Sequence, residues 1–340
     1  MMHFLHRLPF SIKNLFLTSI ISIAFFSLPL YADTWEVYSV KLYMENDLLS
    51  GQDAQYTGGS KIDVVYKIDN PDSLYNLLFV DDSKSYCFRS FAIASQLYTP
   101  ADLTKREPIY DDWSYAGWTY LESGIHKSSS KTLSSLIIRV GMVGPSAGGE
   151  EIQKTIHKWT GSTQPKGWNN QLYDELGINL TYLYKKRYEY ETSDGWGVVY
   201  IPSVDVDLGN ISTQASVGLF IRTGYNIAKD FGVSTISVSG ESAIPAYKEQ
   251  KSSLKKRWSY SFNFLLRGSA VAKDIFVEGN TFKDSIVVHE RENFVGYIGV
   301  GFTLRYRSFA LDFLQIHNTA RAKDIDSSHT VGTLLFTYFY

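Results

Sequence analysis

The chain has 340 residues, with 33 Lys and Arg against 35 Asp and Glu, a formal net charge of −2 and a single cysteine, Cys87. This balance provides no basic field for nucleic acid, and one thiol cannot form an intramolecular disulfide. The composition therefore excludes a disulfide scaffold and argues against a nucleic-acid partner. Because all-β proteins of this length commonly form one domain, we predict a single domain.

The N-terminal segment is typical of a secretory signal peptide. Positively charged residues precede an apolar stretch over residues 15–30, and Ala32 then precedes Asp33. We predict cleavage after Ala32, so that 1–32 is removed and 33–340 is the mature domain. The alternative, a membrane-anchoring helix, needs about 20 apolar residues, and this stretch is shorter and interrupted by Ser and Thr.

Alternating hydrophobicity dominates the mature chain. Later segments do not approach 18 consecutive apolar residues, which leaves a soluble exported protein or a β-barrel. Leu42 and Met44 lie on an apolar face, for example, and Lys41 lies on the opposite face of the same segment. We predict twelve strands, over residues 36–44, 60–68, 89–97, 117–127, 132–143, 177–191, 198–207, 212–225, 258–272, 287–305, 308–319 and 329–340.

The last predicted strand alternates regularly and ends the chain on an aromatic residue, Tyr340. This ending is similar to the C-terminal signal that the outer-membrane insertion machinery of Gram-negative bacteria recognises. The 24 tyrosines suit the aromatic girdles of outer-membrane barrels. We therefore predict an all-β, twelve-stranded antiparallel outer-membrane barrel that is monomeric. Side chains fill most of the interior of a barrel of this size, which disfavours a wide pore.

Residues 144–161 break the alternation. Glu150 and Glu151 suit the first turn of a short helix, Lys158 suits the last turn, and Gly161 suits the left-handed position that follows a helix. We predict a short loop helix at the rim of the barrel.

Two arrangements of this helix are possible. Gln153 and His157 share one face, so the helix could present a candidate catalytic histidine to the barrel wall. Alternatively, the apolar residues Ile152, Ile156 and Trp159 could pack inward and leave His157 in solvent. The sequence alone leaves both arrangements open.

Polar clusters follow and precede predicted strands. Glu45, Asn46 and Asp47 end the first strand, and Thr57 and Gly58 come just before the second. Such oxygen-rich clusters suit a hard cation such as Ca²⁺, although Asn and Asp are also ordinary turn residues. Asn46 is in phase with the apolar face of its strand, so a site here would open toward lipid. Further along, the adjacent cations at 105 and 106 could meet anionic lipid or solvent.

Taken together and in order, these segments resemble the motifs of the outer-membrane lipid A 3'-O-deacylases. The resemblance implies a twelve-stranded barrel that requires Ca²⁺ and removes the 3'-linked acyloxyacyl group of lipid A, the anchor of lipopolysaccharide. The motifs that carry it are Glu45-Asn46-Asp47, Tyr56-Thr57-Gly58, Tyr98-Thr99-Pro100 followed by Lys105-Arg106, Asp112 through Tyr115-Ala116-Gly117, and Gly144-Pro145, Gly148-Gly149, Glu151, Gln153 and His157.

The resemblance also implies residue roles. It assigns Asn46, Asp47, Thr57 and Lys105 to the active site, with Asp47 near the metal. A carboxylate-held Ca²⁺ could polarise the ester carbonyl, and Thr57, Lys105 or the backbone N–H of Gly58 could complete the oxyanion site.

The remaining roles follow from side-chain chemistry. His157 is the candidate base that activates water, Gln153 is a candidate for orienting the ring or the water, and Arg106 can pair with a lipid A phosphate. The family member compared has an acidic residue six positions after its histidine, where this chain has Thr163. If that carboxylate contributes to the metal site there, the ligand set here must differ, and Glu45 or Glu151 could replace it.

Two rival functions remain at this stage. An outer-membrane phospholipase A would also be a calcium-dependent twelve-stranded barrel, but it would need a serine nucleophile beside the histidine, and none stands out. A channel or structural barrel would use the same strands without chemistry.

Overall fold

The computed structural model describes residues 35–47, 55–80, 84–237, 244–246, 258–325 and 328–340. The predicted signal peptide, residues 1–32, lies outside the described residues. Val37–Tyr340 form one unit, to which the following description applies.

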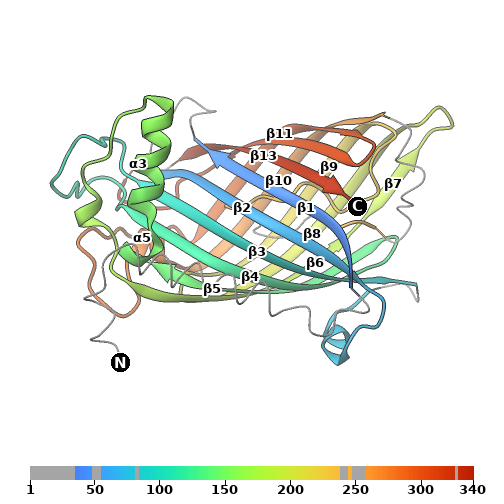
Figure 1. The fold of residues 1–340 in the computed structure, drawn as a ribbon, viewed down its shortest axis with the longest axis horizontal. Coiled ribbons are helices and arrows are strands. Elements are labelled where there is room, and N and C mark those ends of the chain that lie inside the picture. The colour runs from blue at the N-terminus through green and yellow to red at the C-terminus, as the bar shows by residue number, and fades with distance from the viewer. Residues whose placement is uncertain (1–34, 48–54, 81–83, 238–243, 247–257, 326–327) are drawn as a thin grey trace. The chain divides into compact units, whose positions relative to one another are not determined.

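Antiparallel strands account for most of the described chain (Figure 1). Each strand pairs with its neighbour along the chain except that β6 does not pair with β7; β1 pairs with β13, and β6 pairs with β8 to close the barrel. The strands are β1 (Trp35–Asn46), β2 (Gln55–Ile68), β3 (Tyr86–Thr99), β4 (Ala116–Ser128), β5 (Thr132–Val143), β6 (Glu175–Lys186), β7 (Tyr188–Glu191), β8 (Trp196–Gly209), β9 (Ser212–Tyr225), β10 (Trp258–Asp274), β11 (Phe294–Tyr306), β12 (Phe309–Asn318) and β13 (His329–Phe339).

The strand β7 continues β6 past Arg187, since both pair with β8. β6 and β7 thus count as one strand of the wall. Within the described residues the wall has twelve strands, which confirms the predicted fold class. One predicted strand is wrong in its extent: β11 begins at Phe294, and residues before it form a rim segment that starts with the short helix α5 (Ile275–Glu278). The ring of Phe276 in α5 stacks on Tyr98 at a centroid distance of 3.9 Å, so this segment covers the barrel mouth instead of extending the strand.

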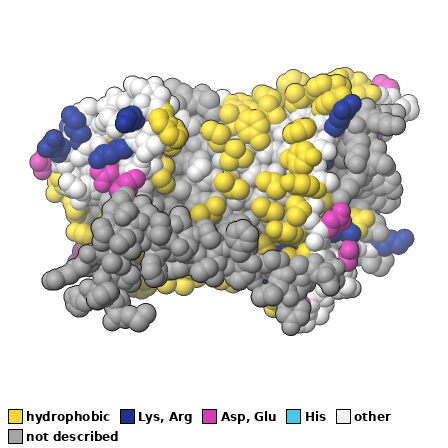
Figure 2. All heavy atoms as spheres, in the orientation of Figure 1, with side chains coloured by type: hydrophobic (Ala, Val, Ile, Leu, Met, Phe, Trp, Pro, Cys, Tyr) yellow, Lys and Arg dark blue, Asp and Glu magenta, His cyan; other side chains and the backbone are white. Residues whose placement is uncertain are grey.

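The predicted alternation separates an apolar outer wall from a polar interior. On β1, Leu42 and Met44 are exposed on the outer face, whereas Lys41 is buried inside. The face that Figure 2 shows carries a band of hydrophobic side chains on the wall, with charged side chains nearer the two ends. Inside, Glu122 accepts from Lys61 at 2.6 Å and from Arg139 at 2.8 Å. Buried charges are tolerable there because they are paired.

The connection between β9 and β10 contributes to the filling of the barrel. Phe231 and Ile236 pack with inward residues of the wall, the Tyr43 hydroxyl lies 2.9 Å from the hydroxyl of Ser234, and Lys185 donates to the carbonyl of Phe231 at 3.1 Å. The described part of the lumen is therefore largely filled by side chains and by this segment.

Because the wall has an even number of antiparallel strands, the start of β1 and the end of β13 lie at the same edge of the barrel. The connections at the opposite edge include residues 100–115, 144–174 and 275–293 and are longer in total than those at the first edge, of which residues 69–85 and 226–257 are the longest. Because outer-membrane barrels have their longer loops outside, we assign this second edge to the outer surface. Among the described residues, no helix is both long and apolar enough to cross a membrane.

Candidate active site

The loop between β5 and β6 forms the predicted helix, α3 (Gly149–Thr160), preceded by the short turn η4 (Pro145–Ala147) and followed by η5 (Trp168–Asn170). Gly161 follows α3 with a φ of 74°, the left-handed conformation that its sequence position predicts. Figure 1 shows α3 lying across the outer-edge ends of the wall strands, where it contacts β3 and β4.

Small residues let the helix approach the wall closely. A Cβ atom on Gly117 of β4 would lie 3.1 Å from the Cα of Gly149, and one on Gly149 would lie 2.7 Å from the ring of Trp168. The hydroxyl of Thr119 donates to the carbonyl of Ala147 at 2.8 Å. The start of α3 is thus fixed against the outer face of β4.

The buried face of α3 carries the polar residues Gln153 and His157, and Ile152 is partly buried against the cluster that includes Trp168. Gln153 is 1% exposed and His157 is 5% exposed, whereas Ile156 and Trp159 are 44% and 80% exposed. Of the two arrangements left open by the sequence, the structure has the one in which the histidine faces the wall. Glu150, on the edge of this face, pairs with Lys154.

The ring of His157 is held by a backbone carbonyl. Its Nδ1 lies 2.5 Å from the carbonyl oxygen of Thr163. Because a carbonyl can only accept, Nδ1 carries the proton, and in the neutral ring Nε2 is the nitrogen with a free lone pair. A base for water needs this tautomer. The carbonyl of Thr163 therefore orients the ring.

Gln153 is fixed by Trp168 of η5. Its Oε1 accepts from the indole Nε1 at 2.8 Å, and its Nε2 is buried without a hydrogen-bond partner among the described residues. A buried donor without a hydrogen-bond partner costs free energy of folding. Its presence on the same helix face as a candidate base therefore suggests that it binds a molecule at the site. The amide nitrogen of Gln153 can donate to an oxygen of a bound molecule. The ring of His157 is oriented by Thr163 and not by Gln153.

The rim of β1 and β2 gathers the next predicted residues. A bulge between Tyr56 and Gly58 sets Thr57 out of register, and its hydroxyl lies 2.6 Å from that of Thr99. The Nδ2 of Asn46 donates to the carbonyl of Thr57 at 3.2 Å. Gly58 is required here, because a Cβ would lie 2.9 Å from the carbonyl oxygen of Glu45. Bulges of this kind re-aim side chains next to active sites.

The two predicted carboxylate ligands have different surroundings. Glu45 points into the barrel, where it accepts from Tyr56, Thr333 and the backbone N–H groups of Ile236 and Ser237 at 2.7–3.0 Å. Four donors occupy its oxygens, which leaves this carboxylate poorly suited to bind a cation. Asp47, just past β1, is fully buried.

The fit to a calcium ion is therefore partial. Among the described residues, no group of three or more His, Cys, Asp or Glu side chains could hold a metal. Glu151, the other suggested replacement ligand, is exposed on α3. Of the predicted carboxylate ligands, Asp47 alone remains a reasonable candidate.

Lys105 and Arg106 lie exposed on the loop between β3 and β4. This loop is tied to the chain that follows α3, because the N–H of Lys166 donates to the carbonyl of Leu103 at 2.9 Å and Asn170 donates to that of Arg106 at 2.6 Å. Hydrogen bonds from Thr104 also lower the pKa of the Asp102 carboxyl in the same loop. The two cations and α3 thus belong to one lobe on the outer wall.

One serine was overlooked in the sequence analysis. Residues 144–148 spell Gly-x-Ser-x-Gly around Ser146, a pattern found at nucleophilic serines. Here Ser146 is exposed in the turn η4, and its hydroxyl donates to Asp174 at 2.9 Å. A strand-to-helix elbow with a histidine partner is not formed by this described segment, so its geometry gives no reason to assign Ser146 as a nucleophile.

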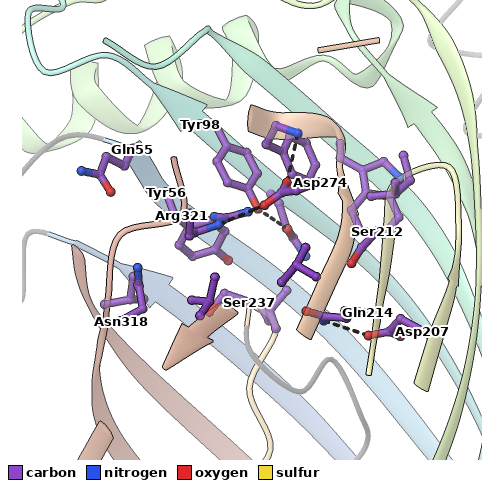
Figure 3. Close-up of a pocket in the computed structure, with 18 of the residues that line it drawn as sticks. Gln55, Tyr56, Tyr98, Asp207, Ser212, Gln214, Ser237, Asp274, Asn318 and Arg321 are labelled. Carbon is purple, nitrogen blue, oxygen red and sulfur yellow. Dashed lines mark hydrogen bonds and ion pairs between the residues drawn. The ribbon is translucent and has the colours of Figure 1, made fainter. Parts of the chain in front are cut away.

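A separate cavity of about 110 Å³ lies inside the barrel (Figure 3). Its polar lining includes the ion pair of Arg321 with Asp274, at 2.5 Å, and the hydrogen bond from Gln214 to Asp207, at 3.0 Å. Neither His157 nor Gln153 lines it. The candidate site is thus on the outside of the wall and distinct from the lumen.

A closed antiparallel barrel with an apolar outer band and a paired polar interior defines an outer-membrane β-barrel protein, here with a histidine-bearing helix on its outer wall. The chain belongs to the LpxR family, since the family model described as "Outer membrane protein LpxR" matches residues 15–340. This confirms the resemblance to the outer-membrane lipid A 3'-O-deacylases. Membership supports an outer-membrane lipid A deacylase of a Gram-negative bacterium.

A solved structure supports the fold. LpxR from Salmonella typhimurium matches with a TM-score of 0.70 and 19% sequence identity, over 89% of this chain and 100% of that chain. The β domain of the Bordetella autotransporter BrkA matches with a TM-score of 0.43 and 9% identity, over 91% of this chain and 100% of that chain. No curated protein sequence matched the chain.

Proposed function

We propose that the protein hydrolyses the ester of the 3'-linked acyloxyacyl group of lipid A, with His157 as the base that activates water. The observation that carries the proposal is the buried ring of His157, whose Nδ1 is fixed by Thr163 so that Nε2 can accept a proton. The family assignment supplies the substrate class.

In the proposed reaction His157 transfers one proton twice. Nε2 of His157 takes a proton from water, the oxygen of that water bonds to the acyl carbon, and the imidazolium then returns the proton to the leaving sugar oxygen as the ester C–O bond breaks. The products are the acyloxyacyl chain as a free carboxylic acid, with its secondary ester intact, and a 3'-hydroxyl on the sugar. Gln153 Nε2, Thr57, Lys105 and the backbone N–H of Gly58 are the candidate donors to the oxyanion.

The location of the lobe suits a substrate that never leaves the membrane. Leu42 and Met44 face outward on β1, and Asn46 is in phase with them at the outer edge of the same strand. A lipid could reach such a site by lateral diffusion. A substrate of the lumen would instead have to pass the segment that fills the barrel.

A requirement for Ca²⁺ is proposed from the family resemblance, with Asp47 as the carboxylate that would hold it. A bound Ca²⁺ would polarise the ester carbonyl. The proton transfers proposed for His157 do not involve the ion.

We expect a chelator to reduce deacylation, and added Ca²⁺ to restore it better than Mg²⁺, which demands stricter octahedral geometry. The Asp47→Asn variant should need a higher Ca²⁺ concentration for the same rate, because it loses the charged ligand. Titration of activity against free Ca²⁺ measures the shift. Full activity in excess chelator would remove the ion from the proposal.

Lys105→Ala and Arg106→Ala should differ in kind. If Lys105 contacts the developing oxyanion, its loss should lower kcat more than it raises KM. Arg106→Ala should mainly raise KM, and more for bisphosphorylated lipid A than for a dephosphorylated analogue, because guanidinium pairs well with phosphate. Steady-state kinetics on both substrates measure this. Equal losses of kcat in the two variants, without dependence on phosphate, would contradict the assignment.

The rival functions predict different lipid products. Mass spectrometry of lipids from cells with and without the gene should show loss of one acyloxyacyl group from lipid A. Altered phospholipids with intact lipid A would favour a phospholipase, and unchanged lipids would favour a barrel without chemistry.

A further inference from the structure

The outward face of α3 is unusual for a helix in water. A surface helix normally buries its apolar stripe and exposes its polar face. Here Gln153 and His157 are buried and Ile152 is partly buried, whereas Ile156 and Trp159, one turn apart, are exposed. A side chain as large as Trp159 at 80% exposure leaves most of its apolar surface uncovered by the described protein.

This face continues the lipid-facing wall. Gly117 and Thr119 of β4 lie under the start of α3, and Leu121 follows on the same face of the strand and is exposed. At about 3.3 Å per residue, Leu121 lies roughly 7 Å along the strand from Thr119. On the neighbouring strand β5, Ile138 and Val140 are also exposed. The helix therefore lies at the outer border of the apolar band.

The charges on α3 fit the same surroundings. Lys158, next to Trp159, is exposed, and Lys154 is exposed one turn earlier, although it also pairs with Glu150. Lysine stems can lie along an apolar layer while their ammonium groups reach the anionic headgroups of lipids. Tryptophan is enriched at the same depth, because its ring is apolar and its N–H is polar.

We propose that the exposed apolar side of α3, formed by Ile156 and Trp159 and flanked by Lys158, is a membrane-docking face that contacts the outer-leaflet lipids surrounding the barrel. Its occupant is the boundary between lipid headgroups and acyl chains. Continuity with the apolar wall and the flanking cations favour this occupant over a protein partner, whose interface would not need to follow the border of the band.

The docking face has a consequence for the site. It holds α3 at the depth of the lipid esters, with His157 on the opposite side of the helix toward the wall. This consequence rests on the proposed deacylase function, whereas the docking itself does not.

Fluorescence quenching of the full-length protein tests the docking. The protein is reconstituted into phosphatidylcholine vesicles whose lipids are brominated near the carboxyl end of the acyl chain. The emission lost in Trp159→Phe reports the signal of Trp159, and the emission lost in Trp113→Phe, whose indole is buried inside the protein, is the matched control. We expect brominated lipid to remove most of the Trp159 signal and little of the Trp113 signal, with Trp159 shielded from aqueous acrylamide.

Two results would overturn the proposal. Quenching of Trp159 by acrylamide but not by brominated lipid would mean that the face lies in water. Protection from both quenchers would mean that protein, such as a second copy, covers it.

A second measurement links docking to catalysis. The double variant Ile156→Gln with Trp159→Gln should deacylate lipid A in vesicles more slowly than the wild type, but lipid A in detergent micelles at an unchanged rate. Equal loss in both settings would contradict a docking role. If the wild type deacylates in neither setting, the proposed function fails, and the quenching result still decides the docking.

Discussion

His157→Ala is expected to lower the rate of lipid A deacylation by about 10³-fold, within the range that general-base groups contribute. The variant removes the only ring that the buried face of α3 directs toward the wall, and water alone is a poor nucleophile at neutral pH. The barrel should still fold, because α3 lies outside the hydrogen-bonded ring of strands. Mass spectrometry of lipid A incubated with the purified protein in detergent measures the rate, and circular dichroism checks the fold.

Two matched variants sharpen this test. Thr163→Ala should keep near-normal activity, because the group that holds His157 is the backbone carbonyl and not the side chain. Ser146→Ala should also stay active, because water and not serine is the proposed nucleophile. Near-normal activity of His157→Ala would show that this ring is not the base. Loss of activity in Ser146→Ala would instead favour an acyl-enzyme mechanism.

The fold was largely predictable because a barrel wall imposes a period of two on its side chains. That period indicated every strand of the barrel wall. Gly161 and the charged residues of the first and last turns indicated the ends of α3. The prediction failed where apolar residues were not in the wall. Residues 287–293 continue the pattern of β11 but form part of the rim, and Phe231 and Ile236 lie in a connection that packs inside. Both depend on tertiary contacts that a local pattern does not contain.

The candidate site was predictable only where a side chain carries the chemistry. His157 and Gln153 could be placed on one helix face from their spacing alone. The carbonyl of Thr163 could not, because a backbone acceptor has no sequence signal, and Trp168 had no motif to mark it as the partner of Gln153. Glu45 lies in the family motif, but its phase along β1 directs it into the barrel, opposite to Asn46.

Gly117→Val is expected to lower kcat for deacylation by about 10²-fold, the cost typical of a misplacement of roughly 1 Å in a catalytic group. A Cβ at position 117 would lie 3.1 Å from the Cα and 3.3 Å from the N of Gly149. Both are backbone atoms that cannot rotate away, so the start of α3 must move off the wall and carry the buried residues of the helix with it. Valine suits a strand, so the wall itself should stay intact.

The same change on the far wall provides the control. Gly268 of β10 is also exposed on the outer face of the barrel, and a Cβ there would meet no atom within 4 Å. Gly268→Val should therefore keep normal activity and the same thermal unfolding profile as the wild type. Because Gly117→Val leaves the chemistry of His157 unchanged, its loss should appear in kcat for detergent-dispersed lipid A with the barrel still folded. If both valine variants are equally active, close contact between α3 and the wall does not position the catalytic histidine.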